Sequence, residues 1–288
     1  MNRTIATILY ILLPLLALTS CGGAKLKTAD EQMARGEYFD ASKTYRKIYN
    51  KLKPREQRAE RAEVAYKMAE CHRQLGQDAR AAAAYQNALR YGYPDSTILL
   101  RLAQSQHGQG QYALAVKSYE EYLAKYPGDA LAERSLAGAR KAAEIKKNKT
   151  RYVVRNATLF NSRRSDFAPM FNGDILYFTT TNEKVKGTNR SEITGMKRSD
   201  IWMARKNEQG AWQKPEPVEG ELNSEWDEGI CSFSPDGSTM YLTRAIRKPG
   251  SNTGTEIHTS QRSDAQWSAP VKFEVIPDTL SSYGHPAV

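Results

Sequence analysis

Apolar residues recur at helical spacing from about residue 25 to residue 147, and they alternate with polar residues after Tyr152. The first stretch is rich in Ala, Lys, Arg, Glu, Gln and Tyr, which predicts helices almost throughout. The second stretch is rich in β-branched and aromatic residues between clusters of Gly, Pro, Asn and Asp, which predicts short strands joined by turns. The pattern therefore predicts an α+β chain of two domains, helical over 25–147 and β over 156–288, with a linker over 148–155.

A third pattern lies at the start of the chain, where a mostly apolar run from Ile5 to Leu18 precedes Cys21. The run is too short and too weakly flanked for a transmembrane helix, so it predicts a secretory signal over 1–20. The stretch LTSCGG resembles the lipobox of bacterial lipoproteins. That resemblance implies removal of the signal, acylation of Cys21, a short tether over 21–24 and anchoring in the outer membrane. The alternative is a signal cut elsewhere, with an incidental cysteine.

The helical stretch contains a repeat, which appears when ARGEYFDASKTYRKI, QLGQDARAAAAYQNAL and GQGQYALAVKSYEEYL are aligned. In each segment Gly is followed five residues later by Ala and four residues after that by Tyr. The glycines are Gly36, Gly76 and Gly110, the alanines are Ala41, Ala81 and Ala115, and the tyrosines are Tyr45, Tyr85 and Tyr119. The glycines are 40 and 34 residues apart, which is the range of helical solenoid repeats.

This pattern resembles the tetratricopeptide repeat, a pair of antiparallel helices. The glycine would supply a left-handed turn, the alanine a close approach and the tyrosine the filling of the groove to the next helix. Pro94 and Pro127 fall near the ends of repeats, and a last helix over 130–147 would cap the stack. In such proteins the first helix of each repeat lines a concave groove. Here that implies a partner-binding surface with the residues Asp30, Met33, Tyr66, Glu70, Arg73, Gln104 and His107. These lack the Lys and Asn pattern of the carboxylate-clamp subtype, so capture of a C-terminal carboxylate is not implied.

The charge of +10 is unevenly distributed. Residues 22–150 carry 24 Lys or Arg against 15 Asp or Glu, whereas residues 151–288 carry 17 of each. A secretory signal and the lack of an interleaved aromatic and basic stripe argue against nucleic-acid binding. A solvated basic surface and an acidic protein partner both fit the excess.

The β stretch is repeated as well, since FAPMFNGDILYFTT (167–180) aligns with GICSFSPDGSTMYLTR (229–244). Phe171 then matches Phe233 and Tyr177 matches Tyr241. Downstream, Trp212 and Trp267 each stand three residues before a proline. A third copy begins at the end of the sequence, where GHPAV aligns with GICSF.

These copies resemble the TolB-type, WD40-like β-propeller repeat, in which Asp236 and Gly237 would form the hairpin between two strands of a blade. The expected fold is therefore an α-solenoid followed by an incomplete all-β propeller of about two blades and the start of a third. Because propellers need about four to eight blades, we expect the sequence to be the N-terminal portion of a longer protein. A smaller sandwich that closes by itself is the alternative.

A lipobox, tetratricopeptide repeats and a TolB-type propeller together resemble the PorE-type lipoproteins of the Bacteroidota, components of type IX secretion. The resemblance implies a non-enzymatic periplasmic scaffold whose partners are envelope or secretion-complex proteins. In that family a carboxypeptidase-regulatory-like domain and an OmpA-like domain follow the propeller, and the OmpA-like domain binds peptidoglycan; neither is present in this sequence. CGGAKLKT has no acidic residue directly behind Cys21, so we expect the body to face the periplasm.

Two other functions compete with the scaffold. The first is a SusD-like glycan-binding lipoprotein, and the second is the regulatory propeller of a hydrolase. No G-x-S-x-G motif occurs, and Asp166, Asp227 and Glu228 fit structural repeat positions better than an acid and base pair. Neither the cysteines nor the histidines show metal-ligand spacing, so no metal or cofactor is expected. Cys71 and Cys231 are expected to be buried free thiols, and a disulfide between them is the alternative.

Overall fold

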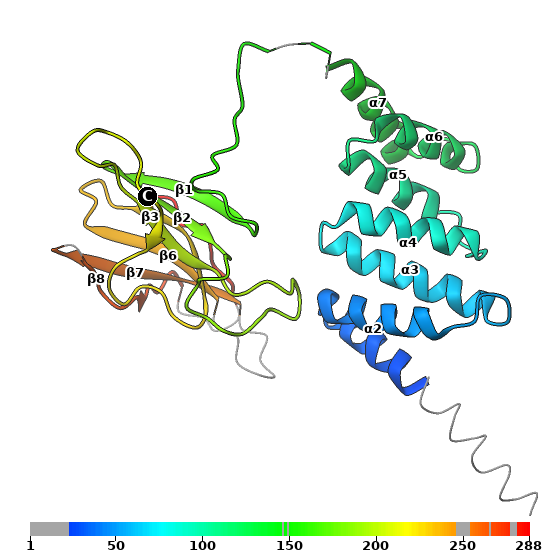
Figure 1. Ribbon diagram of the computed structural model, residues 1–288, viewed down its shortest axis with the longest axis horizontal. Helices are drawn as coiled ribbons and strands as arrows, with labels where there is room; N and C mark the ends of the chain where they lie inside the picture. Colours follow the sequence, from blue (N-terminus) through cyan, green and yellow to red (C-terminus); the bar gives the residue numbers. More distant parts are fainter. Residues whose placement is uncertain (1–22, 146, 149, 246–253, 265, 277–280) are drawn as a thin grey trace, which may run out of the picture. The chain divides into compact units, whose positions relative to one another are not determined.

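The computed structural model describes all residues except 1–22, 146, 149, 246–253, 265 and 277–280. The predicted signal and Cys21 therefore lie outside the described residues. The chain divides into two compact units (Figure 1). One consists of residues up to Tyr152 together with 192–195, and its helical part is called the helical unit here. The other, called the β unit, holds Val153–Ser191 and Met196–Val288.

The described part of the helical unit contains seven helices, of which the first spans residues 23–34. The others are α2 (Tyr38–Lys51), α3 (Arg58–Gln74), α4 (Asp78–Arg90), α5 (Ile98–Gly108), α6 (Tyr112–Leu123) and α7 (Ala130–Ile145). Consecutive helices pack side by side in one stack (Figure 1). They form three pairs followed by α7, so this region is an N-terminal stack of tetratricopeptide repeats within an α+β chain.

The turn inside each pair is made by the repeated glycine. Gly36, Gly76 and Gly110 have φ values of 77°, 64° and 71°, a conformation that residues with a Cβ rarely adopt. Five residues later the alanines are completely buried, which lets the two helices of a pair approach closely. The repeated tyrosines are also buried, with exposed fractions of 0–1%. They fill the space between neighbouring helices.

The β unit consists of two antiparallel sheets. The first sheet has the order β1 (Asp166–Asn172), β2 (Ile175–Thr180), β3 (Asp200–Ala204) and β4 (Glu216–Pro217). The second has the order β5 (Asp227–Phe233), β6 (Thr239–Ala245), β7 (Thr255–Ser263) and β8 (Gln266–Trp267), with β9 (Val271–Lys272) also paired to β7. One apolar cluster, which includes Tyr177, Met203, Met240 and Trp267, fills the space between the two sheets.

The two sheets repeat each other pair by pair, as the aligned segments predict. Phe171 pairs with Leu176 in the first sheet, and Phe233 pairs with Met240 in the second. This register makes Tyr177 the counterpart of Tyr241. The first strand of each sheet also contains an irregularity at the same place, between Phe167 and Met170 and between Gly229 and Cys231. At these places Ala168 and Ile230 have positive φ values of 52° and 44°.

The hairpin of the second sheet uses the Ser-Pro-Asp-Gly loop. Gly237 has a φ of 71°, and its N–H donates to the Ser234 carbonyl at 2.8 Å. Asp236 accepts hydrogen bonds from the Ser234 hydroxyl and the Ser238 N–H, and these bonds lower the pKa of its carboxyl to about 2. In the first sheet the turn is shorter, and Gly173 adopts the positive φ of 56°.

Candidate functional site

The predicted groove residues come from the first helices of three repeats. Asp30 and Met33 lie on the helix of residues 23–34. Tyr66, Glu70 and Arg73 lie on α3, and Gln104 and His107 lie on α5. Tyr85 of the neighbouring helix α4 bonds to Glu70, and its ring lies near Tyr66.

Glu70 is the centre of this group. Its side chain is nearly buried, yet its carboxylate accepts a hydrogen bond from the Tyr85 hydroxyl and two from the Arg73 guanidinium, at 2.8 and 3.1 Å. Arg101 of the next repeat lies 4.0 Å from the same carboxylate. Because a buried carboxylate is costly unless it is paired, these partners account for an acid at this depth. Burial, followed by the bond to Glu70, raises the pKa of the Tyr85 phenol.

The first repeat contains the same arrangement. The Tyr45 hydroxyl donates to Asp30 at 2.6 Å, and Lys67 of the second repeat reaches Asp30 at 2.9 Å. Asp30 precedes Tyr45 by 15 residues, as Glu70 precedes Tyr85. In both cases the cation comes from the first helix of the following repeat. The bonds therefore tie successive repeats together.

A pair of stacked tyrosines lies beside the Glu70 group. Tyr66 and Tyr93 are almost parallel, with ring centroids 4.3 Å apart, and Tyr66 is 6.1 Å from Tyr85. Both Tyr66 and Tyr93 are only partly buried. Burial raises the pKa of each phenol, so both are neutral at physiological pH. A ligand at this place would meet aromatic surface next to the guanidinium groups of Arg73 and Arg101.

Gln104 and His107 belong to a different local environment. The His107 ring lies edge-on to Tyr112 and Tyr119, at centroid distances of 5.6 and 6.2 Å. Gln104 is half-buried and occupies the position that Glu70 has in the preceding repeat. Within the described residues, no hydrogen bond, ion pair or ring contact connects either residue to Glu70. The predicted groove thus contains the connected group around Glu70, the separate contacts of Asp30 and Met33 with Tyr45, and two residues of α5 that are apart from both.

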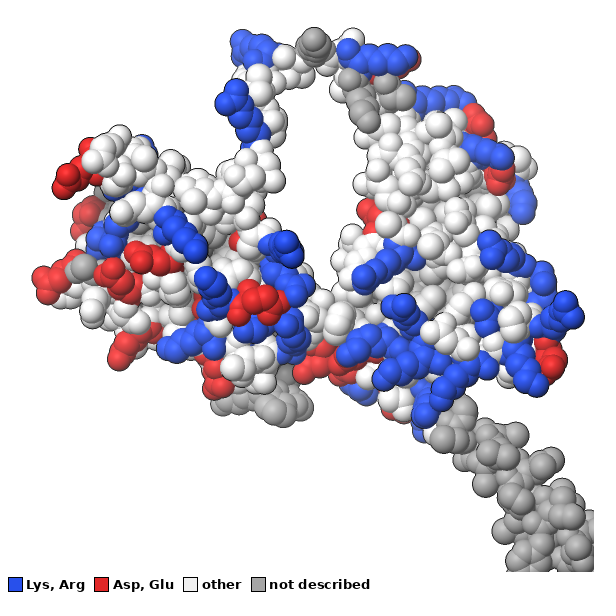
Figure 2. Space-filling model, in the orientation of Figure 1, with Lys and Arg blue, Asp and Glu red and all other residues white. Residues whose placement is uncertain are grey.

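Sequence reasoning missed Tyr93, Lys67 and Arg101 as members of this surface. The sequence contained a signal for the two cations. Lys67 stands three residues before Glu70, and Arg101 stands three residues before Gln104, which occupies the same position in the next repeat. Their acidic partners lie in the preceding repeat, 37 and 31 residues away. On the face that Figure 2 shows, Lys and Arg side chains spread widely over the helical unit, with fewer Asp and Glu side chains among them.

The two repeated tryptophans of the β unit occupy equivalent places but have different neighbours. Trp267 is buried between the sheets, 6.3 Å from Tyr177 and 5.9 Å from Phe233. Trp212 lies on the other side of the first sheet, 5.5 Å from Phe160. The difference arises because the first sheet covers Trp267, whereas a segment that precedes β1 covers Trp212.

The three acidic residues near the strand starts are engaged in structural bonds. Asp166 accepts from the Thr180 hydroxyl at 2.6 Å, Asp227 accepts from Arg198 at 3.0 Å, and Glu228 accepts from Arg244 at 2.8 Å.

Among the described residues no group of three or more His, Cys, Asp or Glu is placed to hold a metal ion. Cys71 and Cys231 are free and buried, and burial raises the pKa of each thiol to about 12. No helix in the described part of the chain has the length and apolarity to cross a membrane.

Comparison with known proteins agrees with the helical fold. The family model of the tetratricopeptide repeat matches residues 63–96 and 98–129, which contain most of α3 and all of α4, α5 and α6. No curated protein matches the chain. Similar solved structures include the MamA protein, at 20% identity over 46% of this chain and 69% of that chain, with a TM-score of 0.39.

Two further structures are tetratricopeptide domains. The first such domain of Spaghetti (RPAP3), bound to the HSP90 peptide SRMEEVD, is 16% identical over 44% of this chain and 94% of that chain, with a TM-score of 0.36. The Sgt2 domain from Aspergillus fumigatus is 19% identical over 47% of this chain and 89% of that chain, with a TM-score of 0.36. The family-model match and the helix pairs together show that the N-terminal half of this chain contains tetratricopeptide repeats, a fold that typically serves protein–protein interaction.

Proposed function

We propose that this chain is a lipid-anchored scaffold of a bacterial outer membrane, with its body in the periplasm and a role in a secretion or envelope complex like that of the PorE-type lipoproteins. The proposal rests on a tetratricopeptide stack that begins at residue 23, two residues after a cysteine whose flanking sequence resembles a lipobox. The stack offers a protein-binding surface, and the cysteine offers the means to hold it at a membrane. No catalytic role is part of this proposal.

The surface around Glu70 indicates what kind of partner the helical unit would bind. The side chains of Arg73 and Arg101 are 29% and 39% exposed, and both guanidinium groups lie within 4.0 Å of the Glu70 carboxylate. An acidic segment of a partner would compete with Glu70 for these cations and would lie against the Tyr66 and Tyr93 rings. The basic excess of the helical unit would favour its approach through long-range attraction.

Lipid anchoring is tested with Cys21→Ser in a bacterial host. The variant should lose palmitate labelling and should no longer pellet with membranes, since acyl chains supply the anchor. Ser20→Ala, which keeps a small residue ahead of the cysteine, is the matched control and should still be labelled. Palmitate on the Cys21→Ser protein would overturn this part of the proposal.

Partner binding is tested by a pull-down from envelope extract with residues 22–147 and residues 151–288 expressed separately. Far-ultraviolet circular dichroism confirms first that each half is folded. Binding to 22–147 should weaken as salt rises, because screening acts over roughly 8 Å at physiological ionic strength. Arg73→Ala and Arg101→Ala should reduce binding, while Arg140→Ala on α7, which is 59% exposed, should not. Retention of envelope proteins by 151–288 with none retained by 22–147 would show that the helical unit is not the binding surface.

A further inference from the structure

A cavity of about 270 Å³ lies on the first sheet of the β unit, on the face opposite the second sheet. Its apolar wall is formed by Leu159, Phe160, Phe178, Trp202 and Pro215. Phe178 and Trp202 come from β2 and β3 and are buried, whereas Leu159 is 46% exposed. The volume is below that of most cofactor or drug-sized pockets, so it suits a single large apolar side chain.

The second sheet shows what normally covers this kind of surface. By the strand register, Leu242 and His258 are the counterparts of Phe178 and Trp202. Leu242 is completely buried, in the same cluster as Ile201 and Met203 of the first sheet. On the second sheet this position is therefore covered by large apolar side chains of β3 in the first sheet. On the first sheet, within the described residues, Phe160 and Trp212 pack against the equivalent surface, and the cavity remains beside them.

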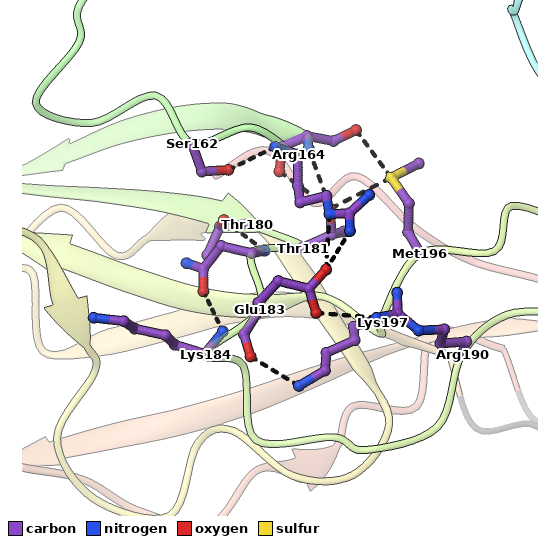
Figure 3. Close-up of polar contacts among 11 residues, drawn as sticks. Ser162, Arg164, Thr180, Thr181, Glu183, Lys184, Arg190, Met196 and Lys197 are labelled. Atoms are coloured by element: carbon purple, nitrogen blue, oxygen red, sulfur yellow. Dashed lines mark hydrogen bonds and ion pairs between the residues drawn. The ribbon is translucent and has the colours of Figure 1, made fainter.

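The rim of the cavity carries Glu183, Lys184 and Lys214. The Glu183 carboxylate is already bound by the guanidinium groups of Arg164 and Arg190, the latter at 3.0 Å, and the bond from Arg164 lowers the pKa of this carboxyl (Figure 3). The ammonium groups of Lys184 and Lys214 have no carboxylate partner within the described residues. Figure 3 shows the Lys184 side chain directed away from the Glu183 group. The free charges of the rim are therefore positive.

The walls of the cavity are fixed by internal bonds. Arg164 and Glu183 connect the segment before β1 to the segment after β2 (Figure 3). The Asn182 side chain accepts from the Lys184 N–H at 2.7 Å, and the Asn161 amide donates to Asn156 at 2.6 Å. One polar atom of each amide is therefore used inside the protein, which leaves fewer polar groups for the hydroxyls of a sugar. A mostly apolar wall with a cationic rim is better matched to a peptide.

We propose that this cavity binds an extended, strand-like peptide segment of a partner protein, with one large aliphatic side chain between acidic residues. The aliphatic side chain contacts Phe160 and Trp202, and the carboxylates lie near Lys184 and Lys214. This assigns a ligand to the β unit and so goes beyond the proposed function, which places partner binding on the helical unit. The two surfaces are independent.

The test uses the full chain from residue 22 and a blocked pentapeptide with isoleucine between two pairs of acidic residues. All four tryptophans belong to the β unit, and Trp202 lines the cavity, so tryptophan fluorescence reports binding there. We expect a dissociation constant on the order of 0.1–1 mM, as for a single side-chain anchor. Serine in place of isoleucine, or lysines in place of the acids, should each weaken binding at least tenfold.

Variants locate the site. Lys184→Glu with Lys214→Glu should weaken binding at least tenfold, and Leu159→Ala several-fold; all three residues are exposed, so folding should be retained. Lys47→Glu, an exposed lysine of the helical unit, should bind the peptide normally. Equal loss in Lys47→Glu, equal binding of the serine peptide, or oligosaccharide binding that the cavity variants abolish would overturn the proposal. Failure of the envelope pull-down would leave this result unaffected, since the peptide assay needs no envelope partner.

Discussion

The backbone N–H of His285 donates to the hydroxyl of Thr243 at 2.8 Å, just as the N–H of Ile230 donates to Thr179 at 3.0 Å. Both donors have positive φ values, 57° and 44°. The carbonyl of Thr255 accepts from the Tyr283 N–H, as the carbonyl of Ser199 accepts from the Glu228 N–H. The segment near the end of the sequence therefore lies against the second sheet as β5 lies against the first.

Thr179→Val tests how much the hydrogen bond between Ile230 of β5 and Thr179 of β2 stabilises the β unit. Thr179 is 1% exposed and Ile230 is partly buried, so the substitution leaves the Ile230 N–H without its acceptor at a place with little access to water. We expect a loss of about 1–3 kcal/mol in the free energy of unfolding of the β unit. Urea unfolding followed by tryptophan fluorescence measures it. Thr239→Val, where the hydroxyl is bonded to an exposed Gln261, is the control and should change stability by less than about 0.5 kcal/mol. Equal effects of the two substitutions would show that the Ile230–Thr179 hydrogen bond does not stabilise the β unit.

Tyr85→Phe tests the bond between helices in the second repeat. Removal of the hydroxyl takes one donor from the buried Glu70 carboxylate, at a cost of about 1–3 kcal/mol. Thermal unfolding monitored by circular dichroism at helical wavelengths should show the loss. Tyr119→Phe is the matched substitution in the third repeat, where Gln104 stands in place of the acid, and it should cost less. A similar loss in both variants would mean that tyrosine packing, rather than the carboxylate bond, stabilises the repeats.

Asp200→Asn tests the effect of a buried acid on pH dependence. Asp200 is 1% exposed; one oxygen accepts from the Lys186 N–H at 2.6 Å, and the other has no partner among the described residues. Burial, the largest cause, and nearby Glu228 raise the pKa of this carboxyl to about 6. The folded state thus binds the proton more tightly than the unfolded state. Its stabilising effect is present below about pH 4 and is lost as the pH rises through about 6.

The neutral amide keeps the acceptor for Lys186 without the buried charge. Asp200→Asn should therefore be more stable than the parent at pH 8, by roughly 1–2 kcal/mol, and the difference should disappear toward pH 4. Urea unfolding of both proteins at a series of pH values, followed by tryptophan fluorescence, provides the measurement. Asp227→Asn, which loses charge at the Arg198 ion pair, should instead be destabilised at pH 8. A pH-independent difference for Asp200→Asn would rule out titration of this group.

The two internal cysteines should be unreactive in the folded protein. Both thiols are buried and have pKa values raised to about 12, so the thiolate that reacts with alkylating or disulfide reagents is scarce at pH 8. With Cys21 replaced by Ser, Ellman's reagent should find no fast-reacting thiol in the native protein and two thiols in urea. No thiol in urea would indicate a disulfide between Cys71 and Cys231, contrary to the structure.

The repeats follow from the sequence because local geometry requires particular residues. A turn with positive φ favours Gly36, Gly76 and Gly110, so the helix pairs could be predicted from their spacing. In the β unit, a shift of one residue would exchange the two faces of a strand. The match of Phe171 with Phe233 in the sequence therefore predicted the register that the two sheets adopt.

Only the tertiary structure decided how the candidate surfaces are assembled. The sequence indicated that Glu70 and Arg73 lie on one helix, but the contact of Glu70 with Arg101 depends on how successive repeats stack. The cavity on the first sheet depends on the path of the segment around Phe160, which has no repeat counterpart and no helical or strand period. Periodicity specifies which face of an element is buried, whereas contacts between elements and the paths of irregular segments arise from packing of the whole domain.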